Sequence, residues 1–232
     1  DSANVSKLAH DAGALVVVDN VFATALHQRP LELGADIVIY STTKHIDGQG
    51  RLMGGAILGT SAFITDVLLP FYRQTGAAIS AFNAWVMLKS LETLPIRFAA
   101  QCKSAATIAA WLDQHPKIAT VSYPGLASHP QHDLARRQMS DFGTIMSFRL
   151  HGDATDMAGA FAFLNNLSLI DISNNLGDSK SLACHPYTTT HSSLSDGALA
   201  NLGITGADIR LSEGLEAVED LIADIDAALM GQ

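Results

Sequence analysis

This chain of 232 residues has few cysteines, few positive charges and no long apolar run. Its two cysteines, Cys102 and Cys184, cannot build the disulfide framework of a small secreted domain. The 14 Lys and Arg residues are outnumbered by 23 Asp and Glu residues, which gives a formal net charge of −9, and no basic stripe occurs. This balance excludes an ordinary nucleic-acid binder, and the absence of a run of about 18 apolar residues excludes a membrane-spanning helix.

The composition instead favours a globular protein with a well-formed core. Hydrophobic residues make up 48% of the 232 residues and charged residues 16%, which excludes wholesale disorder and suffices for one large domain or two modest ones. The start lacks the basic and then apolar segments of a secretory signal, so we expect a soluble cytoplasmic protein. The chain begins with Asp1 and Ser2 and enters a helical pattern that ends near Gly13, which favours a domain whose front part is missing.

The first part of the chain has the rhythm of an α/β sheet. Residues 15–18 form a continuous apolar run, which predicts a strand buried on both faces. Residues 36–40 predict a second buried strand, and residues 56–58 predict a third, short one. Helix, strand, crossover and strand in this order predict parallel strands.

The pattern of apolar residues after residue 80 predicts a further set of helices and strands. Apolar positions at helical spacing predict a long helix over residues 80–114, which Pro95 breaks or restarts. An amphipathic helix closes the chain over residues 218–229, with acidic residues in or near its first turn. Between the two, short apolar segments predict strands over residues 119–123, 144–150, 168–172 and 209–212.

Polar residues follow two of the predicted strands. Asp19 comes directly after the first strand, and Lys44 comes shortly after the second. Because ligands of open α/β sheets bind outside the carboxyl ends of the strands, both residues could face one crevice. The lysine is either a solvated loop residue or a nucleophilic amine that forms a Schiff base with an aldehyde cofactor. The neighbouring hydroxyls of Ser41 and Thr43 could bind a phosphate, and they favour the second interpretation.

Other candidate residues also have two interpretations. A buried Asp19 could keep the nitrogen of a pyridine ring protonated and so make the ring an electron sink, whereas an ordinary strand-end Asp caps the next turn. Arg210 lies in a short strand of alternating character, where it either holds a substrate carboxylate or forms an internal salt bridge. The nine histidines lack a familiar zinc spacing, so we predict no metal site.

Five motifs in a fixed order extend over essentially the whole chain. They are Val-Val-Val-Asp-Asn at residues 16–20, Tyr-Ser-Thr-Thr-Lys at 40–44, Gly-Asp-Ser-Lys-Ser-Leu at 177–182, His-Pro-Tyr-Thr-Thr-Thr-His at 185–191 and Arg-Leu-Ser-Glu-Gly-Leu-Glu at 210–216. As a set they resemble the Cys/Met-metabolism family of pyridoxal-phosphate enzymes, which have fold type I, the aspartate-aminotransferase-like fold. The resemblance implies an α/β chain. Residues 1–92 would be the C-terminal part of a cofactor-binding large domain with a mostly parallel sheet, and residues 93–232 would be a small α+β domain with an antiparallel sheet covered by helices.

The resemblance also implies an activity. Residues 46–51, 80–85 and 91–95 are most similar to the O-succinylhomoserine sulfhydrylase branch of the family. That branch forms homocysteine from an activated homoserine ester and sulfide in methionine biosynthesis. Cystathionine γ-synthase and the cystathionine or methionine γ-lyases remain alternatives within the same chemistry; they differ in the nucleophile and in whether the intermediate is captured or hydrolysed. A non-catalytic fragment of such an enzyme is a further alternative.

The resemblance assigns a cofactor and the residues that hold it. Lys44 would bind pyridoxal 5'-phosphate covalently and then act as the base, and Asp19 would pair with the ring nitrogen. Ser41 and Thr43 would bind the phosphate. The family's glycine-containing phosphate loop and ring-stacking tyrosine would precede Asp1. The expected partners are small-molecule substrates and further copies of the chain, in a homotetramer built from dimers.

The resemblance assigns substrate contacts as well. Arg210 would hold the substrate α-carboxylate with help from Ser181, and Thr190 would lie near the cofactor and the catalytic lysine. Two residues depart from the family pattern: Glu213 stands where Val or Ile is usual, and Tyr187 stands where Ala is common. A carboxylate three residues from Arg210 could compete for its guanidinium, although strand alternation would point the two side chains to opposite faces.

Overall fold

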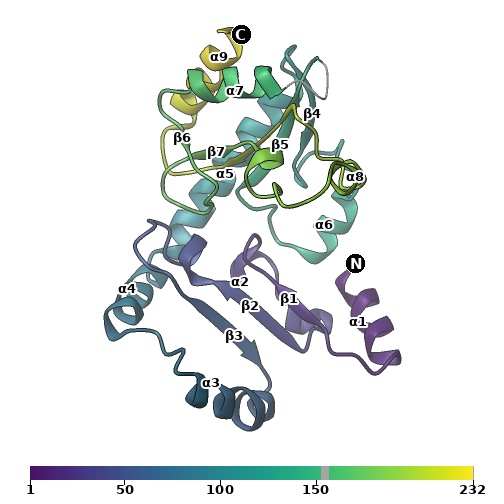
Figure 1. Ribbon diagram of the computed structural model, residues 1–232, viewed down its shortest axis with the longest axis vertical. Coiled ribbons are helices and arrows are strands. Elements are labelled where there is room, and N and C mark those ends of the chain that lie inside the picture. The colour runs from purple at the N-terminus through teal and green to yellow at the C-terminus, as the bar shows by residue number, and fades with distance from the viewer. Residues whose placement is uncertain (153–156, 232) are drawn as a thin grey trace. The chain divides into compact units, whose positions relative to one another are not determined.

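The computed structural model describes residues 1–152 and 157–231, and the chain divides into two compact units (Figure 1). Unit 1 comprises Asp1–Pro95 and Asp133–Asp141, and unit 2 comprises Ile96–His132 and Phe142–Gln232. Each unit has its own sheet. No helix of the described residues combines the length and the hydropathy needed to cross a bilayer.

Unit 1 contains a three-stranded sheet with helices and short helical turns along the connections. Its elements are α1 (Ser2–Asp11), β1 (Val17–Asp19), α2 (Thr24–His27), η1 (Pro30–Leu33), β2 (Ile37–Ser41), η2 (Thr42–Ile46), β3 (Gly55–Gly59), η3 (Phe63–Leu68), α3 (Leu69–Thr75) and α4 (Ala81–Leu91). The first helix forms where the sequence predicts it, because Asp1 accepts a hydrogen bond from the backbone N–H of Asn4 and Gly13 takes up a left-handed φ of 74° after the last turn.

The sheet of unit 1 has the order β1-β2-β3, with β2 in the centre. Strands β1 and β2 are parallel, as predicted, whereas β3 runs antiparallel to β2. Central Val38 is only 1% exposed, but Val17 on the edge strand is 53% exposed. The prediction that residues 15–18 form a strand buried on both faces is therefore wrong. The strand begins only at Val17, and it lies at the edge of the sheet with no neighbouring strand on its open side in the described structure.

Unit 2 contains a five-stranded sheet and most of the long helices. The elements of the chain from residue 94 onward are α5 (Leu94–Asp113), β4 (Ile118–Ser122), α6 (His132–Gln138), β5 (Ile145–Leu150), α7 (Met157–Asn166), β6 (Asp171–Ile172), β7 (Leu182–Cys184), η4 (Pro186–Thr188), α8 (Asp196–Asn201), β8 (Asp208–Ser212) and α9 (Val218–Met230). Helix α5 begins two residues before the unit boundary, and most of α6 belongs to unit 1. The long helical segment restarts at Leu94 with Pro95 in its first turn, as the sequence predicts.

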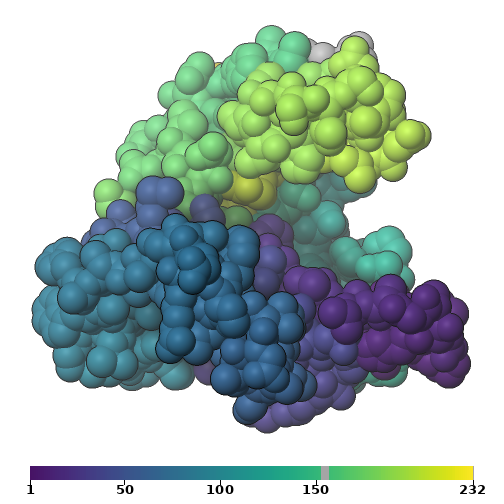
Figure 2. All heavy atoms as spheres, turned by 60° about the horizontal axis from the view of Figure 1, so that its bottom comes forward, coloured from purple at the N-terminus to yellow at the C-terminus, as the bar shows by residue number. Residues whose placement is uncertain are grey.

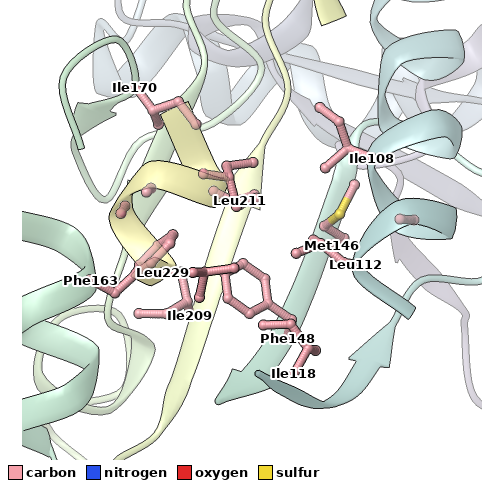
Figure 3. Packing of buried hydrophobic residues seen from close by; sticks show 14 of the residues in the cluster. Ile108, Leu112, Ile118, Met146, Phe148, Phe163, Ile170, Ile209, Leu211 and Leu229 are labelled. Carbon is pink, nitrogen blue, oxygen red and sulfur yellow. The ribbon is translucent and has the colours of Figure 1, made fainter. Parts of the chain in front are cut away.

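The sheet of unit 2 has the order β4-β5-β8-β7-β6 and is antiparallel except for the β6–β7 pair. One face is apolar, because alternate residues of β5 and β8 point to the same side. Figure 3 shows this core, in which Met146, Phe148, Ile209 and Leu211 of the two strands lie among side chains of the helices. The helical side chains of the core come from α5 (Ala105, Ile108, Ala109, Leu112), α7 (Ala160, Phe163, Leu164) and α9 (Leu221, Ile225, Ala228, Leu229).

Candidate functional site in two parts

The lysine and the aspartate predicted to bind a cofactor lie at one edge of the sheet of unit 1. Strands β1 and β2 are parallel neighbours, with Asp19 in register with Ile39. The first strand ends at Asp19 and the second at Ser41, directly before the turn that contains Lys44. Both strand ends therefore face the same side, which is where open α/β sheets bind ligands.

Lys44 lies in a short π-helical turn rather than in a regular helix. Within η2 its backbone angles are φ −89° and ψ −129°, which depart from helical values, and its side chain is half-buried. Buried Thr42 anchors the start of the turn, because its backbone N–H donates to the carbonyl of Gly54 at 2.9 Å. A Cβ at Gly54 would lie 2.7 Å from Thr42 Oγ1, so any larger residue would force the buried Thr42 side chain to shift. Single π-helical turns of this kind often occur at functional sites.

A buried histidine ties the lysine turn to the segment after Asp19. His45 is 1% exposed, and its Nδ1 donates to the carbonyl of Val21 at 3.1 Å. Val21 in turn donates its backbone N–H to Asp19 Oδ1 at 3.0 Å. The link Lys44–His45–Val21–Asp19 thus fixes the two strand ends relative to each other. No local sequence pattern predicts this contact, because it joins residues 24 positions apart.

Asn20 connects the same loop to the central strand. Its side-chain amide donates to the carbonyls of Thr24 and Gln28, each at 2.9 Å, and to the hydroxyl oxygen of Tyr40 at 3.0 Å. Thr24 has a left-handed φ of 56°, which is unfavourable for a β-branched residue and persists only where the surroundings hold it. The bonds of Asn20 supply that support, so the segment after β1 has one defined path.

The far end of the lysine turn is held by a buried acid. Asp47 is 0% exposed, and its carboxylate accepts from the backbone N–H of Arg51 at 2.5 Å and from Arg51 Nε at 3.0 Å. The guanidinium of Arg51 also donates to Ser90 Oγ of α4 at 2.7 Å. These bonds fix the glycine-containing loop after Lys44 to a neighbouring helix.

The two hydroxyl groups predicted to bind the phosphate, those of Ser41 and Thr43, differ in their hydrogen bonds. Thr43 Oγ1 accepts from the backbone N–H of Gly54 at 3.1 Å and donates to the carbonyl of the same residue at 3.5 Å, which leaves it a further lone pair. The hydroxyl of half-buried Ser41 makes no hydrogen bond within the described part of the chain, and neither does the buried Thr42 Oγ1. Hydroxyls without partners at the end of a strand beside a lysine fit a phosphorylated aldehyde. Asp19 is exposed and caps the following turn, so the expectation that it is buried is not met in this structure.

The predicted substrate residues belong to unit 2. Arg210 lies on β8, and its guanidinium donates to the backbone carbonyls of Asn174 and Asn175, each at 2.9 Å. Its Nε is buried and has no hydrogen-bond partner among the described residues, and no ion pair with Arg210 occurs there. Within the described part of the chain, Arg210 therefore does not form the internal salt bridge that was its alternative interpretation. A cation with a free donor suits a carboxylate ligand.

Arg210 shares its face of the sheet with a pocket of about 510 Å³. Cys184, in register with Arg210, lines this pocket together with His185 and Asn174. Burial raises the pKa of the Cys184 thiol, so it remains a neutral side chain at neutral pH. His185 is held at both ring nitrogens, by Thr188 Oγ1 at 2.9 Å and by the carbonyl of Gly206 at 2.8 Å.

The other two predicted substrate residues have different surroundings. Ser181 is buried, and its hydroxyl donates to Glu216 Oε2 and accepts from the backbone N–H of Gly214, both at 2.9 Å. Thr190 is exposed, and its hydroxyl is paired with His191 Nδ1 at 2.8 Å. The structure thus brings Asp19 and the lysine turn to one sheet edge of unit 1. In unit 2 it surrounds Arg210 with the 174–175 segment rather than with Ser181, and the roles assigned to these residues stay predictions.

Known proteins are similar to this chain over nearly its whole length. The chain is 39% identical, with a TM-score of 0.94, to the crystal structure of cystathionine gamma synthase from Xanthomonas oryzae pv. oryzae in complex with aminoacrylate and cysteine, over 100% of this chain and 59% of that one. It is 54% identical over 230 residues to O-succinylhomoserine sulfhydrylase of Mycobacterium tuberculosis and 41% identical over 230 residues to L-methionine gamma-lyase of Pseudomonas putida. Each alignment covers 99% of this chain and 57% of the relative.

The fold, with a lysine turn at the end of a strand, is that of the pyridoxal-phosphate enzymes of fold type I. The model of the Cys/Met metabolism PLP-dependent enzyme family matches residues 1–230, and the chain belongs to this family. The chain spans somewhat more than half the length of the curated relatives it matches.

Proposed function

We propose that this chain is part of an enzyme that replaces the succinyl ester group of O-succinylhomoserine with sulfide and so forms homocysteine for methionine biosynthesis. The observation that carries the proposal is the difference in similarity: 54% identity to a sulfhydrylase against 41% to a γ-lyase over the same 230 residues. In the reaction the bond between Cγ and the ester oxygen breaks, a bond between Cγ and sulfur forms, and succinate leaves.

Pyridoxal 5'-phosphate, when bound, supplies an aldehyde that reacts with amines and a ring that delocalises the electron pair left by loss of a proton. Lys44 Nζ would bind that aldehyde and, once freed, would carry protons at Cα and Cβ of the substrate. Asp19 would accept a hydrogen bond from the protonated ring nitrogen, and the hydroxyls of Ser41 and Thr43 would donate to the phosphate. The unengaged hydroxyl of Ser41 supports this assignment.

In unit 2, Arg210 would bind the α-carboxylate and so orient the substrate while its Cα proton is removed. The unpartnered Nε of Arg210 supports this role. We keep Ser181 and Thr190 as proposed helpers, Ser181 through the loop that it ties to Glu216 and Thr190 through its exposed hydroxyl. Residues 1–92 and 93–232 are proposed as the cofactor-binding and small domains, respectively.

We also propose a cytoplasmic homotetramer built from dimers. Both cysteines are buried and neither forms a disulfide within the described residues, which is usual in a reducing compartment. The alternative activities are those of cystathionine γ-synthase, which the likeness to the Xanthomonas oryzae structure supports, and of a γ-lyase, which the Pseudomonas putida relative supports.

The cofactor role of Lys44 is tested by adding pyridoxal phosphate and reducing with borohydride. We expect a visible absorbance band and, after proteolysis, the mass of the reduced cofactor on the peptide that contains Lys44. The K44A variant should lose both, whereas K89A, an exposed lysine on α4, should keep both. A protein that stays colourless would favour the non-catalytic alternative, and colour in K44A would refute the assigned lysine.

The activity is tested by offering O-succinylhomoserine or O-acetylhomoserine with sulfide or with cysteine. Homocysteine as the main product with the succinyl ester and sulfide is the expected result. Cystathionine as the main product would support the synthase, and a 2-oxo acid with ammonia would support a lyase. Either outcome would contradict the sulfhydrylase proposal.

A further inference from the structure

A fully buried acid without a partner lies just beyond the strand that carries Arg210. Glu213 follows β8 directly and is 0% exposed. Neither oxygen of its carboxyl group accepts a hydrogen bond from any described residue. An ionised carboxylate in this position would have lost its hydration without replacement, which is strongly unfavourable.

Gln101 of helix α5, which contacts Glu213, also has a buried polar atom without a hydrogen-bond partner among the described residues. Gln101 is 0% exposed, and its Nε2 donates to the carbonyl of Asp178 at 2.7 Å and to the carbonyl of Glu213 at 2.9 Å. Gln101 Oε1 has no partner in the described part of the chain. The unpartnered atoms of these two side chains are all acceptors when Glu213 is ionised. A proton on Glu213 adds the donor that this buried cluster lacks.

The cluster holds the segment 174–181 against the end of β8. Gly177 donates its backbone N–H to Ser212 Oγ at 2.8 Å, and Leu215 donates to the carbonyl of Ser179 at 2.8 Å. The approach is close, because a Cβ at Gly214 would lie 2.4 Å from the backbone nitrogen of Ser181. Gln101 adds a bridge between the two chains through the carbonyls of residues 178 and 213.

The same segment contacts the guanidinium of Arg210 at its other end. Asn174 and Asn175 provide the two carbonyls to which Arg210 donates. By strand alternation Arg210 points to the opposite face from Glu213, so the two side chains do not pair with each other. A shift of the 174–181 segment at the Glu213 end would therefore change the surroundings of Arg210 through the backbone.

The charges near Glu213 favour its neutral form. Burial, and in second place the negative charge of Glu216 in the same loop, raise the pKa of Glu213 to about 8. On the facing segment, the Asp178 carboxylate accepts from the backbone of Lys180, whose own amino group pairs with Asp171. On α5, the ionisable residues nearest to Gln101 in sequence are buried Cys102, exposed Lys103 and buried Arg97, and none of them is among the causes of the shift.

We propose that Glu213 is a proton-dependent positioning residue for Arg210. In its neutral form it completes the buried cluster with Gln101 and keeps the 174–181 segment against β8. In its ionised form it repels Glu216, loosens that segment and weakens the binding of a carboxylate ligand at Arg210. The inference rests on the proposed function of Arg210 as the residue that binds the substrate carboxylate.

The test compares the wild-type cofactor-loaded protein with E213Q, which keeps the shape of the side chain but cannot ionise. The matched control is E219Q, an exposed glutamate in the first turn of α9. The measurement is the dissociation constant of L-norleucine, an amino acid without a leaving group, across neutral to alkaline pH. Because a group with a pKa near 8 changes from mostly neutral to mostly ionised between pH 7 and 9, we expect binding to weaken about tenfold in wild type and E219Q. The constant should stay flat, apart from ionisation of the ligand itself, in E213Q.

A second measurement detects the proton on Glu213 directly. It uses the wild-type protein, so it depends neither on catalytic turnover nor on the folding of a variant. The infrared carbonyl band of a protonated carboxylic acid should be present at neutral pH and disappear with a midpoint near 8. Absence of that band at neutral pH, or an E213Q profile that follows wild type, would overturn the inference. A protein that binds norleucine as described but releases no homocysteine would contradict the proposed activity and leave Glu213 supported.

Discussion

The buried carboxyl group of Glu213 makes unit 2 less stable as the pH rises. Its pKa rises from 4.5 to about 8 in the folded protein. The folded state therefore keeps a proton that the unfolded state releases as pH rises through this window. The stabilisation is fully present below about pH 4.5 and is lost progressively as the pH rises from about 4.5 to about 8. Within this range the free energy of unfolding falls by up to about 1.4 kcal/mol per pH unit. Above that pH the loss levels off.

Urea unfolding of E213Q at several pH values checks this expectation. The free energy of unfolding of the variant should fall less steeply than that of wild type between about pH 5 and 8, so that the difference between them grows with pH. E219Q should follow wild type, because its side chain is exposed. Parallel pH curves for E213Q and wild type would show that Glu213 ionises normally.

His45 offers a second prediction for a single residue, in unit 1. Replacement by Ala removes a buried ring and leaves the carbonyl of Val21 without its donor. We expect a loss of about 2–4 kcal/mol in the free energy of unfolding. Exposed His151 is the matched control, and H151A should change stability by about 0.5 kcal/mol or less.

Because His45 joins the turn of Lys44 to the loop after Asp19, H45A should also weaken cofactor binding. Titration of each variant with pyridoxal phosphate, followed by visible absorbance, measures this effect. Cofactor affinity equal to that of wild type would refute the role of His45 in holding the two strand ends together.

At the scale of elements, helix α9 depends on one buried face. Its neighbouring residues Leu229 and Met230 lie in the same last turn, yet Leu229 is 0% exposed and Met230 is 59% exposed. We expect L229A to lower the free energy of unfolding by about 2–5 kcal/mol and M230A by less than about 1 kcal/mol. Chemical denaturation of both variants provides the measurement, and equal losses would contradict the packing described for this helix.

Elements with a strong local pattern could be predicted from the sequence. Helices α1 and α9 have regular apolar spacing and recognisable ends, and β5 and β8 are apolar on alternate positions. Strand β7 has no local signal in the sequence, because its three residues form a strand only by pairing with β6 and β8. The direction of β3 and the exposure of Val17 likewise depend on neighbouring chain segments, which local spacing does not specify.

In the candidate site, too, the local features could be predicted from the sequence and the long-range contacts could not. The end of a strand is a local feature, so Asp19 and Lys44 could be assigned to one sheet edge from the parallel rhythm alone. The contacts that hold them, from His45 to Val21 and from Asp47 to Arg51, join loops whose paths follow from tertiary folding. Arg210 contacts backbone carbonyls, which every residue has, so no sequence pattern predicts that the 174–175 segment lies beside it.

At the scale of the whole molecule, the two units differ in how well they bury their apolar side chains. Unit 2 has a continuous core between its sheet and three helices. Unit 1 leaves large apolar side chains exposed on α3 and α4, whose atoms form part of the blue surface in Figure 2. On α4, Phe82, Trp85 and Leu88 are 68%, 58% and 59% exposed, and their spacing places them on one side of the helix. Exposed aromatic and aliphatic side chains gathered in this way usually mark an interaction surface.

If the protein is a homotetramer, as proposed, this face of α4 should be covered by another copy. Phe82 and Trp85, with ring centroids 6.3 Å apart, would then be central anchors of the contact. Replacing Trp85 with Glu should weaken association by about 2 kcal/mol or more, which is at least about 30-fold in the dissociation constant. The measurement is the molar mass by light scattering over a dilution series. K103E, which changes the charge of an exposed residue of α5, serves as the control and should keep the mass of wild type. A W85E variant that also keeps that mass at every concentration would show that α4 lies outside the subunit interfaces.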